Sequence, residues 1–264
     1  MNFRLQCVRF GAPLLAAFCL LSSAACHRGG KSKLPVAGSV DADKFLFDRG
    51  SDALARKHWI EAREYFRRLV DTYPGSQYRS RAKLGLGDAY LGENTVESRI
   101  IAINEFREFL SYFPGNERAD YAQFRIATGL FNQMLSPQRD QTATKDALKE
   151  FDKFLENYPS SPLKPDVQKM RRAVRDRLSD AEYLVGHFYM KNRWCPGAIE
   201  RMRVLLSDDP GYSRRDAAYF DMGECLVKLN FKQDAVPLFQ KIVDEFPKSK
   251  FRKDAAKRVA QLKR

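Results

Sequence analysis

The sequence predicts an all-α protein, a right-handed superhelical solenoid of about five stacked helical hairpins with a C-terminal cap helix. Three observations predict this fold. A pattern of alanine, an aromatic or methionine residue, and proline recurs at a fixed spacing. A small residue precedes each copy, and apolar residues in the C-terminal half recur every three or four positions. Hydrophobic residues make up 44% and charged residues 30% of the 264 residues, which is typical of a protein that forms a core.

The repeat is defined by its spacing. An alanine is followed four residues later by phenylalanine or methionine, and eight residues after that by proline. A small residue lies upstream, on the preceding helix. The five copies are Ala62-Phe66-Pro74 after Gly50, Ala102-Phe106-Pro114 after Gly87, Ala147-Phe151-Pro159 after Ala127, Ala198-Met202-Pro210 after Gly186, and Ala235-Phe239-Pro247 after Gly223.

Each part of the repeat has a role in a helical hairpin. The small residue on the first helix lets the second helix approach, the alanine meets it there, and the larger side chain fills the space one turn later. The proline then ends the second helix. This pattern matches the tetratricopeptide signature, and hairpins of this kind bury a continuous core by stacking on one another.

Residues 1–25 have the features of a secretory signal peptide. Arg4 and Arg9 form a basic region before a short apolar stretch at 12–21, and small residues follow it. Cys26 comes next, which resembles a bacterial lipobox, so we expect Cys26 to be acylated and to anchor the chain. An ordinary secretory signal followed by a chance cysteine is the alternative. Because His27 rather than aspartate follows Cys26, the resemblance to lipoprotein families implies the outer membrane and its periplasmic face.

The rest of the chain divides into three parts. Residues 26–43 contain Gly, Ser, Lys and Pro without an apolar period, and we expect a flexible tether. Residues 44–161 hold the first three hairpins, where extra residues predict longer turns at 92–99 and 134–143. Residues 162–264 hold the last two hairpins and the cap helix.

Two apolar stripes define the helices of the C-terminal part. One runs along an unusually long helix at about 166–193, and we expect it to pack against neighbouring hairpins. The other predicts an amphipathic cap helix at about 251–263. The first stripe contains Val167, Met170, Val174, Leu178, Ala181, Val185 and Phe188, and the second contains Phe251, Ala255, Val259 and Leu262.

Two stretches, 139–162 and 177–211, resemble the BamD-type outer-membrane protein assembly lipoproteins. The first has an Arg-Asp pair before an Ala-x-x-x-Phe helix that ends in Tyr-Pro. The second has Glu-x-x-Val-Gly-x-Phe-Tyr and then an Ala-x-x-Arg helix, with Pro196 as a departure. The resemblance covers about residues 40–250. It implies a scaffold that helps to fold and insert β-barrel proteins into the outer membrane, together with a β-barrel insertase and other assembly lipoproteins.

The resemblance implies one binding surface, and the geometry of helical-hairpin solenoids predicts a second. The last two hairpins dock the periplasmic domains of the insertase, with Arg201 at the partner-facing position of its helix and Arg203 beside it. The concave side of the first three hairpins receives an extended peptide from an unfolded outer-membrane protein, the client. Residues near each packing small residue point there, and packing of Phe124 and Phe131 between hairpins is the alternative. The expected groove residues are Phe47, Ser51, Leu54, Leu84, Asp88, Leu91, Phe124, Thr128 and Phe131.

The sequence contains no motif typical of an enzyme active site. Its three histidines have no metal-ligand spacing, and neither a phosphate-binding loop nor a nucleophile elbow occurs. We therefore expect no enzyme activity, cofactor or metal. Cys195 and Cys225 either form one disulfide or stay as two semi-buried thiols. The net charge of +13 would suit nucleic acid, but a secretory signal removes that partner and leaves acidic proteins or anionic lipid.

Two other functions use similar parts. An envelope scaffold that couples cell-wall synthesis to membrane constriction carries such repeats, usually behind a coiled-coil segment, and no heptad run precedes residue 44. A pilotin-like lipoprotein for secretin assembly is the second. The assembly scaffold remains the leading hypothesis, on the strength of the resemblance in 139–211.

Overall fold

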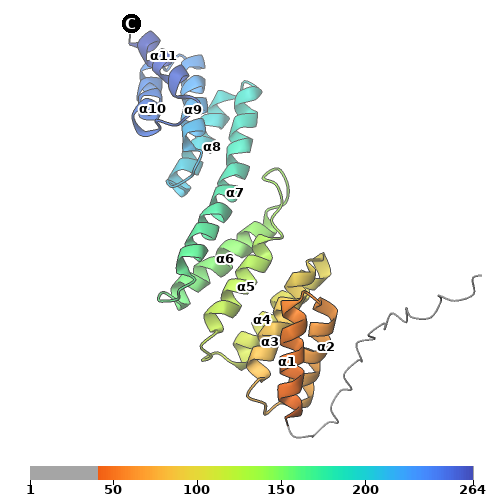
Figure 1. Cartoon of the computed structure of the whole chain (residues 1–264). Helices are drawn as coiled ribbons and strands as arrows, with labels where there is room; N and C mark the ends of the chain where they lie inside the picture. Colours follow the sequence, from red (N-terminus) through yellow and green to blue (C-terminus); the bar gives the residue numbers. More distant parts are fainter. Residues whose placement is uncertain (1–40, 264) are drawn as a thin grey trace, which may run out of the picture. The chain divides into compact units, whose positions relative to one another are not determined.

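The computed structural model describes residues 41–263, and every regular element in that range is an α-helix (Figure 1). The predicted signal peptide, Cys26 and most of the predicted tether lie outside the described residues. The described helices belong to one compact unit. Among them, none is long and apolar enough to cross a membrane.

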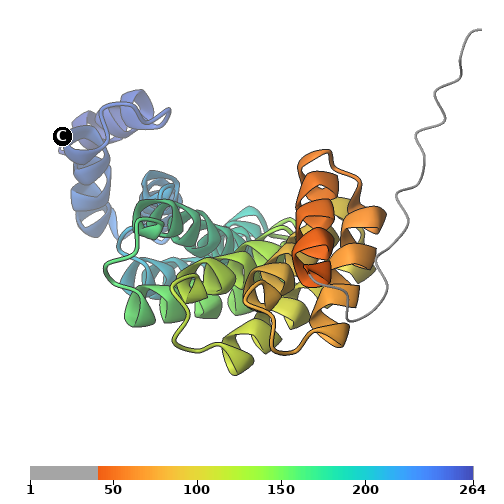
Figure 2. The same ribbon diagram turned by 60° about the horizontal axis from the view of Figure 1, so that its bottom comes forward.

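Consecutive helices form antiparallel hairpins that stack in the order of the sequence (Figures 1 and 2). The predicted all-α solenoid of five hairpins and a cap helix is therefore confirmed. The hairpins are α1 (Ala42–Ala55) with α2 (Trp59–Thr72), α3 (Arg79–Glu93) with α4 (Val96–Tyr112), α5 (Ala119–Phe131) with α6 (Thr142–Asn157), α7 (Lys164–Lys191) with α8 (Cys195–Asp208), and α9 (Arg215–Lys228) with α10 (Lys232–Glu245), and the cap is α11 (Arg252–Leu262).

The small residues of the repeat are the points where the two helices of a hairpin approach closely. A Cβ atom added to Gly87 would lie 2.7 Å from the ring of Phe106, and the corresponding glycines of the first and fifth hairpins meet their phenylalanines at the same distance. At Gly186 the neighbour is Met202, at 3.2 Å. The alanines of the repeat are fully buried in all five hairpins. The predicted packing register is confirmed.

The extra residues of the second hairpin do not lengthen its turn, so that prediction was wrong. Only residues 94 and 95 separate α3 from α4, and α4 has 17 residues where α2 has 14. Thr95 accepts a hydrogen bond from the Ser98 N–H, and the Ser98 hydroxyl accepts one from the Thr95 N–H. This capping box starts the helix early and places the insertion inside it. The third hairpin has the longer loop that was predicted, over 132–141.

In three of the repeats, a serine two residues after the proline ties the connection that follows a hairpin back to the first helix of that hairpin. The Ser76 hydroxyl donates to Asp43 at 2.6 Å, and it accepts a hydrogen bond from the Tyr78 N–H at 3.1 Å. Two later junctions repeat this arrangement with Ser161 and Ser249, which donate to aspartates at the start of α5 and α9. The aspartate lies seven residues before the packing small residue in all three.

The long helix α7 has 28 residues, close to the predicted range, but its apolar stripe is only half buried. Val167 and Val174 are fully buried, whereas Val185 is 36% and Phe188 is 62% exposed. The prediction that the whole stripe packs in the core was therefore wrong. The N-terminal half of α7 packs on α6 and the C-terminal half on α8 and α9, so a different face of the helix is buried there.

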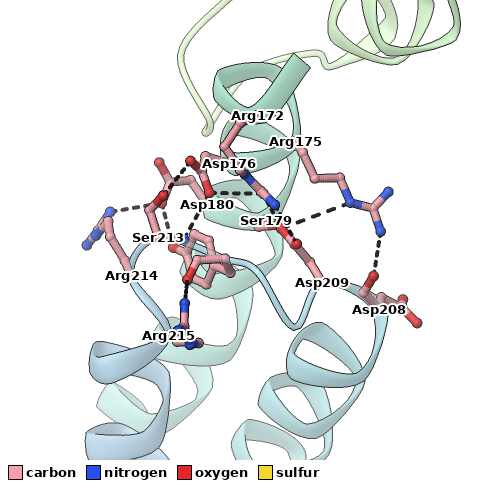
Figure 3. A network of polar contacts seen from close by, with 11 residues as sticks. Arg172, Arg175, Asp176, Ser179, Asp180, Asp208, Asp209, Ser213, Arg214 and Arg215 are labelled. Carbon is pink, nitrogen blue, oxygen red and sulfur yellow. Dashed lines mark hydrogen bonds and ion pairs between the residues drawn. The ribbon is translucent and has the colours of Figure 1, made fainter. Parts of the chain in front are cut away.

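A polar junction interrupts the apolar core at the middle of α7 (Figure 3). The core of the first three hairpins ends at Val174, and the next apolar cluster begins at Tyr183. Between them, polar side chains of α7 meet the loop that joins α8 to α9. The polar junction consists of Arg172, Arg175, Asp176, Ser179 and Asp180 of α7 with Asp208, Asp209, Tyr212, Ser213 and Arg214.

The cap helix packs as the sequence predicts. Ala255 is fully buried, and Phe251, Val259 and Leu262 lie against the core of the fifth hairpin. The Phe251 ring stacks on Phe220 with centroids 4.9 Å apart. The opposite face of α11 carries Lys253 and Lys257 and is exposed, so the helix ends the stack with a polar surface.

Candidate binding surfaces

A groove of about 600 Å³ lies along the first helices of the first two hairpins and reaches the start of α5. We call it the N-terminal groove. It contains five of the residues predicted for the client groove, from both hairpins. Its lining consists of Phe47, Ser51 and Leu54 of α1, Phe66 of α2, Ser80, Arg81, Leu84, Gly85 and Asp88 of α3, Tyr121 of α5, and the connecting residues Gln77, Asn116, Glu117 and Arg118.

The floor of the N-terminal groove is apolar and rigid. Phe47 is 9% exposed and stacks on Tyr78, with ring centroids 5.1 Å apart. Leu84 is 6% exposed and belongs to the same core cluster as Phe47. Leu54 packs against that cluster while staying half-buried. An extended peptide with apolar side chains would find preformed contacts on this floor.

Asp88 lines the groove where it meets the third hairpin. Both of its carboxylate oxygens accept a hydrogen bond from the Tyr121 hydroxyl at 2.9 Å, and the Arg125 Nε lies 2.9 Å from one of them. Burial raises the pKa of Asp88 above its usual value, although the charge of Arg125 opposes the shift. Burial, followed by the charge of Asp88, raises the pKa of Tyr121 to about 12. Asp88 is therefore already engaged by the protein itself.

The predicted residues of the third hairpin lie outside the N-terminal groove. Phe124 packs edge-on against Phe154 at 6.5 Å, and Phe131 packs edge-on against Phe151 at 6.4 Å. Both rings therefore pack against the second helix of their own hairpin, and these two contacts do not test the alternative of packing between hairpins. The Thr128 hydroxyl donates to the carbonyl of residue 125 in its own helix, at 3.1 Å. Leu91 packs against the same core cluster. A client contact of these four residues stays a prediction.

In the C-terminal half, Arg201 lines a shallow pocket of about 330 Å³. We call it the Trp194 pocket, and its other lining residues are Tyr189, Trp194, Gly197, Glu200 and Val204. Trp194 is 54% exposed, and its ring lies over Gly197, where an added Cβ would approach it to 2.6 Å. Tyr189 meets the ring edge-on at 4.6 Å. The exposed apolar ring beside a half-exposed arginine has the composition of a protein-binding spot.

Arg201 and Arg203 lie on different sides of α8, and their part in docking stays a prediction. They are two residues apart on α8, so their side chains leave the helix in nearly opposite directions. Arg201 Nη1 lies 3.4 Å from Glu182, whereas Arg203 is not a lining residue but pairs with the lining residue Glu200 at 2.7 Å. Trp194 was not among the predicted site residues. Its place at the tip of a hairpin, directly before a helix, was the available signal.

Titratable groups outside the two surfaces form structural contacts. Within residues 41–263, no group of three or more His, Cys, Asp and Glu side chains could hold a metal ion. His187 Nδ1 lies 2.6 Å from Asp221, which also accepts a hydrogen bond from Tyr183. Cys195 and Cys225 are buried free thiols, which agrees with the prediction of two thiols rather than with that of a disulfide. Burial, helped by the neighbouring Cys195, raises the pKa of Cys225 to about 12.

Comparison with known proteins gives a consistent picture. The model of the outer membrane lipoprotein family YfiO matches residues 40–235. An outer membrane protein assembly factor BamD of Caulobacter vibrioides is 31% identical over 230 residues, which cover 86% of this chain and 72% of that protein. The protein of the same name from Vibrio cholerae is 29% identical over 175 residues, covering 62% of this chain and 71% of that protein.

Solved structures support the fold. The TPR2AB domain of yeast Sti1, solved in a complex with pHSP90, superposes with a TM-score of 0.50. The match covers 85% of this chain and 84% of that one, at 13% identity. At this level of identity the similarity concerns the tetratricopeptide architecture alone.

Proposed function

Because the chain belongs to the YfiO family of outer membrane lipoproteins, we propose that it is a lipid-anchored scaffold of the machinery that assembles β-barrel proteins in the outer membrane. The relatives that match most of its length are outer membrane protein assembly factors. Its role is to bind other proteins rather than to catalyse a reaction. The observation that supports this role best is the pair of separate surfaces, one groove and one exposed pocket, on the two halves of the solenoid.

Depletion of the protein tests the role as a whole. We expect outer-membrane β-barrel proteins to decrease together in the membrane fraction, because the scaffold acts before their insertion. Quantitative proteomics of that fraction measures this. Loss of secretin assembly alone would instead indicate a pilotin, and a constriction defect with normal β-barrel levels would indicate an envelope scaffold.

The N-terminal groove binds client peptides in this proposal. Ser51 lines the groove beside the apolar floor, so Ser51→Trp fills the space that the peptide would occupy. Asp52 is the next residue, is exposed and lies outside the groove lining, which makes Asp52→Trp the matched control. Fluorescence anisotropy with a labelled peptide from the end of a β-barrel protein should show weaker binding to Ser51→Trp only. Equal binding by both folded variants would place the client site elsewhere.

The Trp194 pocket docks the β-barrel insertase in this proposal. Trp194 supplies a large exposed apolar ring and Arg201 a half-exposed charge, and aromatic and arginine side chains carry much of the energy of protein interfaces. We expect Trp194→Ala and Arg201→Ala each to weaken co-purification of the insertase from membranes. Arg49→Ala removes the same charge from an exposed residue of α1 that is not part of the pocket lining, and it is the control. A loss that is equal for Arg201 and Arg49 would indicate charge alone.

The membrane anchor is Cys26 in this proposal, a residue outside the described part of the chain. The run of small residues before it motivates the assignment. Mass spectrometry of the mature N-terminus should find a cleaved chain that begins with an acylated cysteine. An unmodified terminus, or cleavage at another residue, would refute the anchor without affecting the two binding surfaces.

A further inference from the structure

The N-terminal groove contains two arginines that the protein itself leaves without a carboxylate partner. Arg81 of α3 and Arg118, just before α5, both line the groove and are exposed. Neither makes an ion pair within residues 41–263, where many other arginines do. The engaged acid of the groove, Asp88, is held by Tyr121 and Arg125. Arg118 is near enough to lower the pKa of Asp88 by its charge but does not bond to it.

Each of these arginines is held in place by an aromatic ring. The Arg81 guanidinium carbon lies 4.6 Å from the centroid of Phe47, and that of Arg118 lies 4.7 Å from the centroid of Tyr121. Both rings are themselves fixed, Phe47 by stacking on Tyr78 and Tyr121 by its hydrogen bond to Asp88. A guanidinium stacked on a ring keeps its N–H edges free for a carboxylate, and less side-chain freedom is lost on binding.

The two arginines stand on successive hairpins, above the apolar floor of the same groove. The floor offers Leu54, Leu84 and Phe47 to an apolar side chain. A ligand that fits both features has an apolar side chain next to a carboxylate. Resting on the proposed function of the groove, we propose that the N-terminal groove recognises an extended peptide through a carboxylate, which Arg81 and Arg118 hold while the floor takes the neighbouring apolar side chain.

Glu117 is the feature that opposes this arrangement. It lines the groove next to Arg118, is exposed, and has no ion-pair partner in the described part of the chain. Its charge repels a bound carboxylate and so reduces the affinity that the two arginines provide. Removing that charge should therefore change the affinity in the opposite direction from removing an arginine.

The test uses the full chain and one labelled apolar peptide in three forms. One form has a free C-terminal carboxylate, one is C-terminally amidated, and one is amidated but has an internal aspartate. Fluorescence anisotropy should show the free acid binding about tenfold more tightly than the plain amide, as expected for charge-assisted hydrogen bonds at a partly exposed site. The aspartate form decides whether a side chain can supply the carboxylate in place of the chain end.

Variants then assign the effect to the arginines. Arg81→Ala and Arg118→Ala should each reduce the preference for the free acid and leave binding of the amide almost unchanged, with partial recovery in the lysine variants. Glu117→Gln should strengthen binding of the free acid. Arg49 is the matched control, because it is exposed and stacks on Phe45 at 5.4 Å but does not line the groove.

Two outcomes would overturn the proposal. If the free acid and both amides bind equally, and the arginine variants change nothing, the groove does not recognise a carboxylate. If Arg49→Ala has the same effect as Arg81→Ala, the preference comes from net charge. In both cases Ser51→Trp would still abolish binding if the groove takes peptides, so a failed carboxylate proposal is distinguished from a failed groove.

Discussion

Asp209 is the residue on which the polar junction depends most. Its side chain is 6% exposed, and it accepts two hydrogen bonds from Arg172, at 2.9 and 2.5 Å, and one from the Ser179 hydroxyl at 2.6 Å. Burial alone would raise the pKa of this carboxyl. The hydrogen bonds from Arg172 and Ser179, with the charges of Arg172 and Arg175, outweigh burial and lower the pKa below the usual aspartate value.

The lowered pKa gives a pH dependence with a definite sign. An acid whose pKa is lower in the folded state stabilises that state above its unfolded pKa of about 4 and loses this contribution as the pH falls further. Asp209→Asn should therefore reduce the free energy of unfolding at pH 7 by about 1–3 kcal/mol and flatten its decline below pH 5. Urea titrations at several pH values measure both. If the free energy of unfolding of the variant falls below pH 5 as steeply as that of the parent, other carboxyls cause the decline.

The two helices of a hairpin come into close contact at a glycine. Whether a Gly→Ala substitution stabilises or destabilises the protein tests this contact. In an exposed helix, Gly→Ala stabilises by about 0.5–1 kcal/mol. At Gly87 the new methyl group would lie 2.7 Å from the rigid ring of Phe106, so we expect Gly87→Ala to destabilise by about 1–3 kcal/mol. At Gly186 the neighbour at 3.2 Å is the flexible Met202, so Gly186→Ala should cost less.

Gly75 is the control for these two substitutions. Nothing lies within 4 Å of a Cβ added there, and Gly75→Ala should leave the melting temperature almost unchanged. Thermal melts of the three variants rank the contacts. A ranking in which Gly87→Ala is as stable as the parent would contradict the packing of the second hairpin.

Three of the connections that follow a hairpin are tied to its first helix by one serine hydroxyl each. The Ser161 hydroxyl donates to Asp120 at 2.6 Å and accepts the N–H of Leu163 at 3.1 Å. Removing it leaves a partly buried carboxylate and an N–H without their partner, so Ser161→Ala should cost about 1 kcal/mol. Ser160→Ala is the matched control, because Ser160 is the exposed neighbour and has no such bonds. If the two variants are equally stable in urea, the hydrogen bonds of Ser161 do not contribute to the stability of the protein.

At the scale of the whole molecule, the two halves of the solenoid have separate apolar cores. One core spans the first three hairpins and ends at Val174 of α7, and the others begin at Tyr183. The polar junction and the backbone of α7 connect them. In a solenoid each repeat contacts only its neighbours, so a weak contact between repeats divides the cooperative unit. The proposed client and insertase surfaces lie on different sides of this division.

This division predicts the unfolding behaviour of the chain. The double variant Arg172→Ala with Asp209→Ala removes both members of the central ion pair, so neither of the two is left as a charge without the other. We expect hydrogen exchange to show different protection on the two sides of the polar junction in the parent, and calorimetry to show two separate transitions in the double variant. A single two-state transition in both proteins would mean that α7 alone couples the halves.

The sequence by itself determined the hairpins and their cores. The spacing of Ala62, Phe66 and Pro74, repeated four more times, fixes which faces of the helices meet, because it is set by the local geometry of one helix pair. The cap helix and the length of α7 follow from the same local periodicity. The sequence also repeats an aspartate seven residues before the packing small residue and a serine two residues after the proline, as at Asp43 and Ser76. The meaning of this second pattern became clear only from the hydrogen bond between the two residues in the structure.

Only the tertiary structure decided where the surfaces are. The buried face of α7 changes at the polar junction because different helices pack on its two halves, and an unbroken stripe in the sequence cannot reveal that Phe188 is exposed. The N-terminal groove extends past Asp88 to Tyr121 of the next hairpin, and Asp88 is engaged there because Tyr121 and Arg125 reach it. Such contacts depend on how consecutive hairpins are oriented, which is set by packing between elements rather than by the pattern within one.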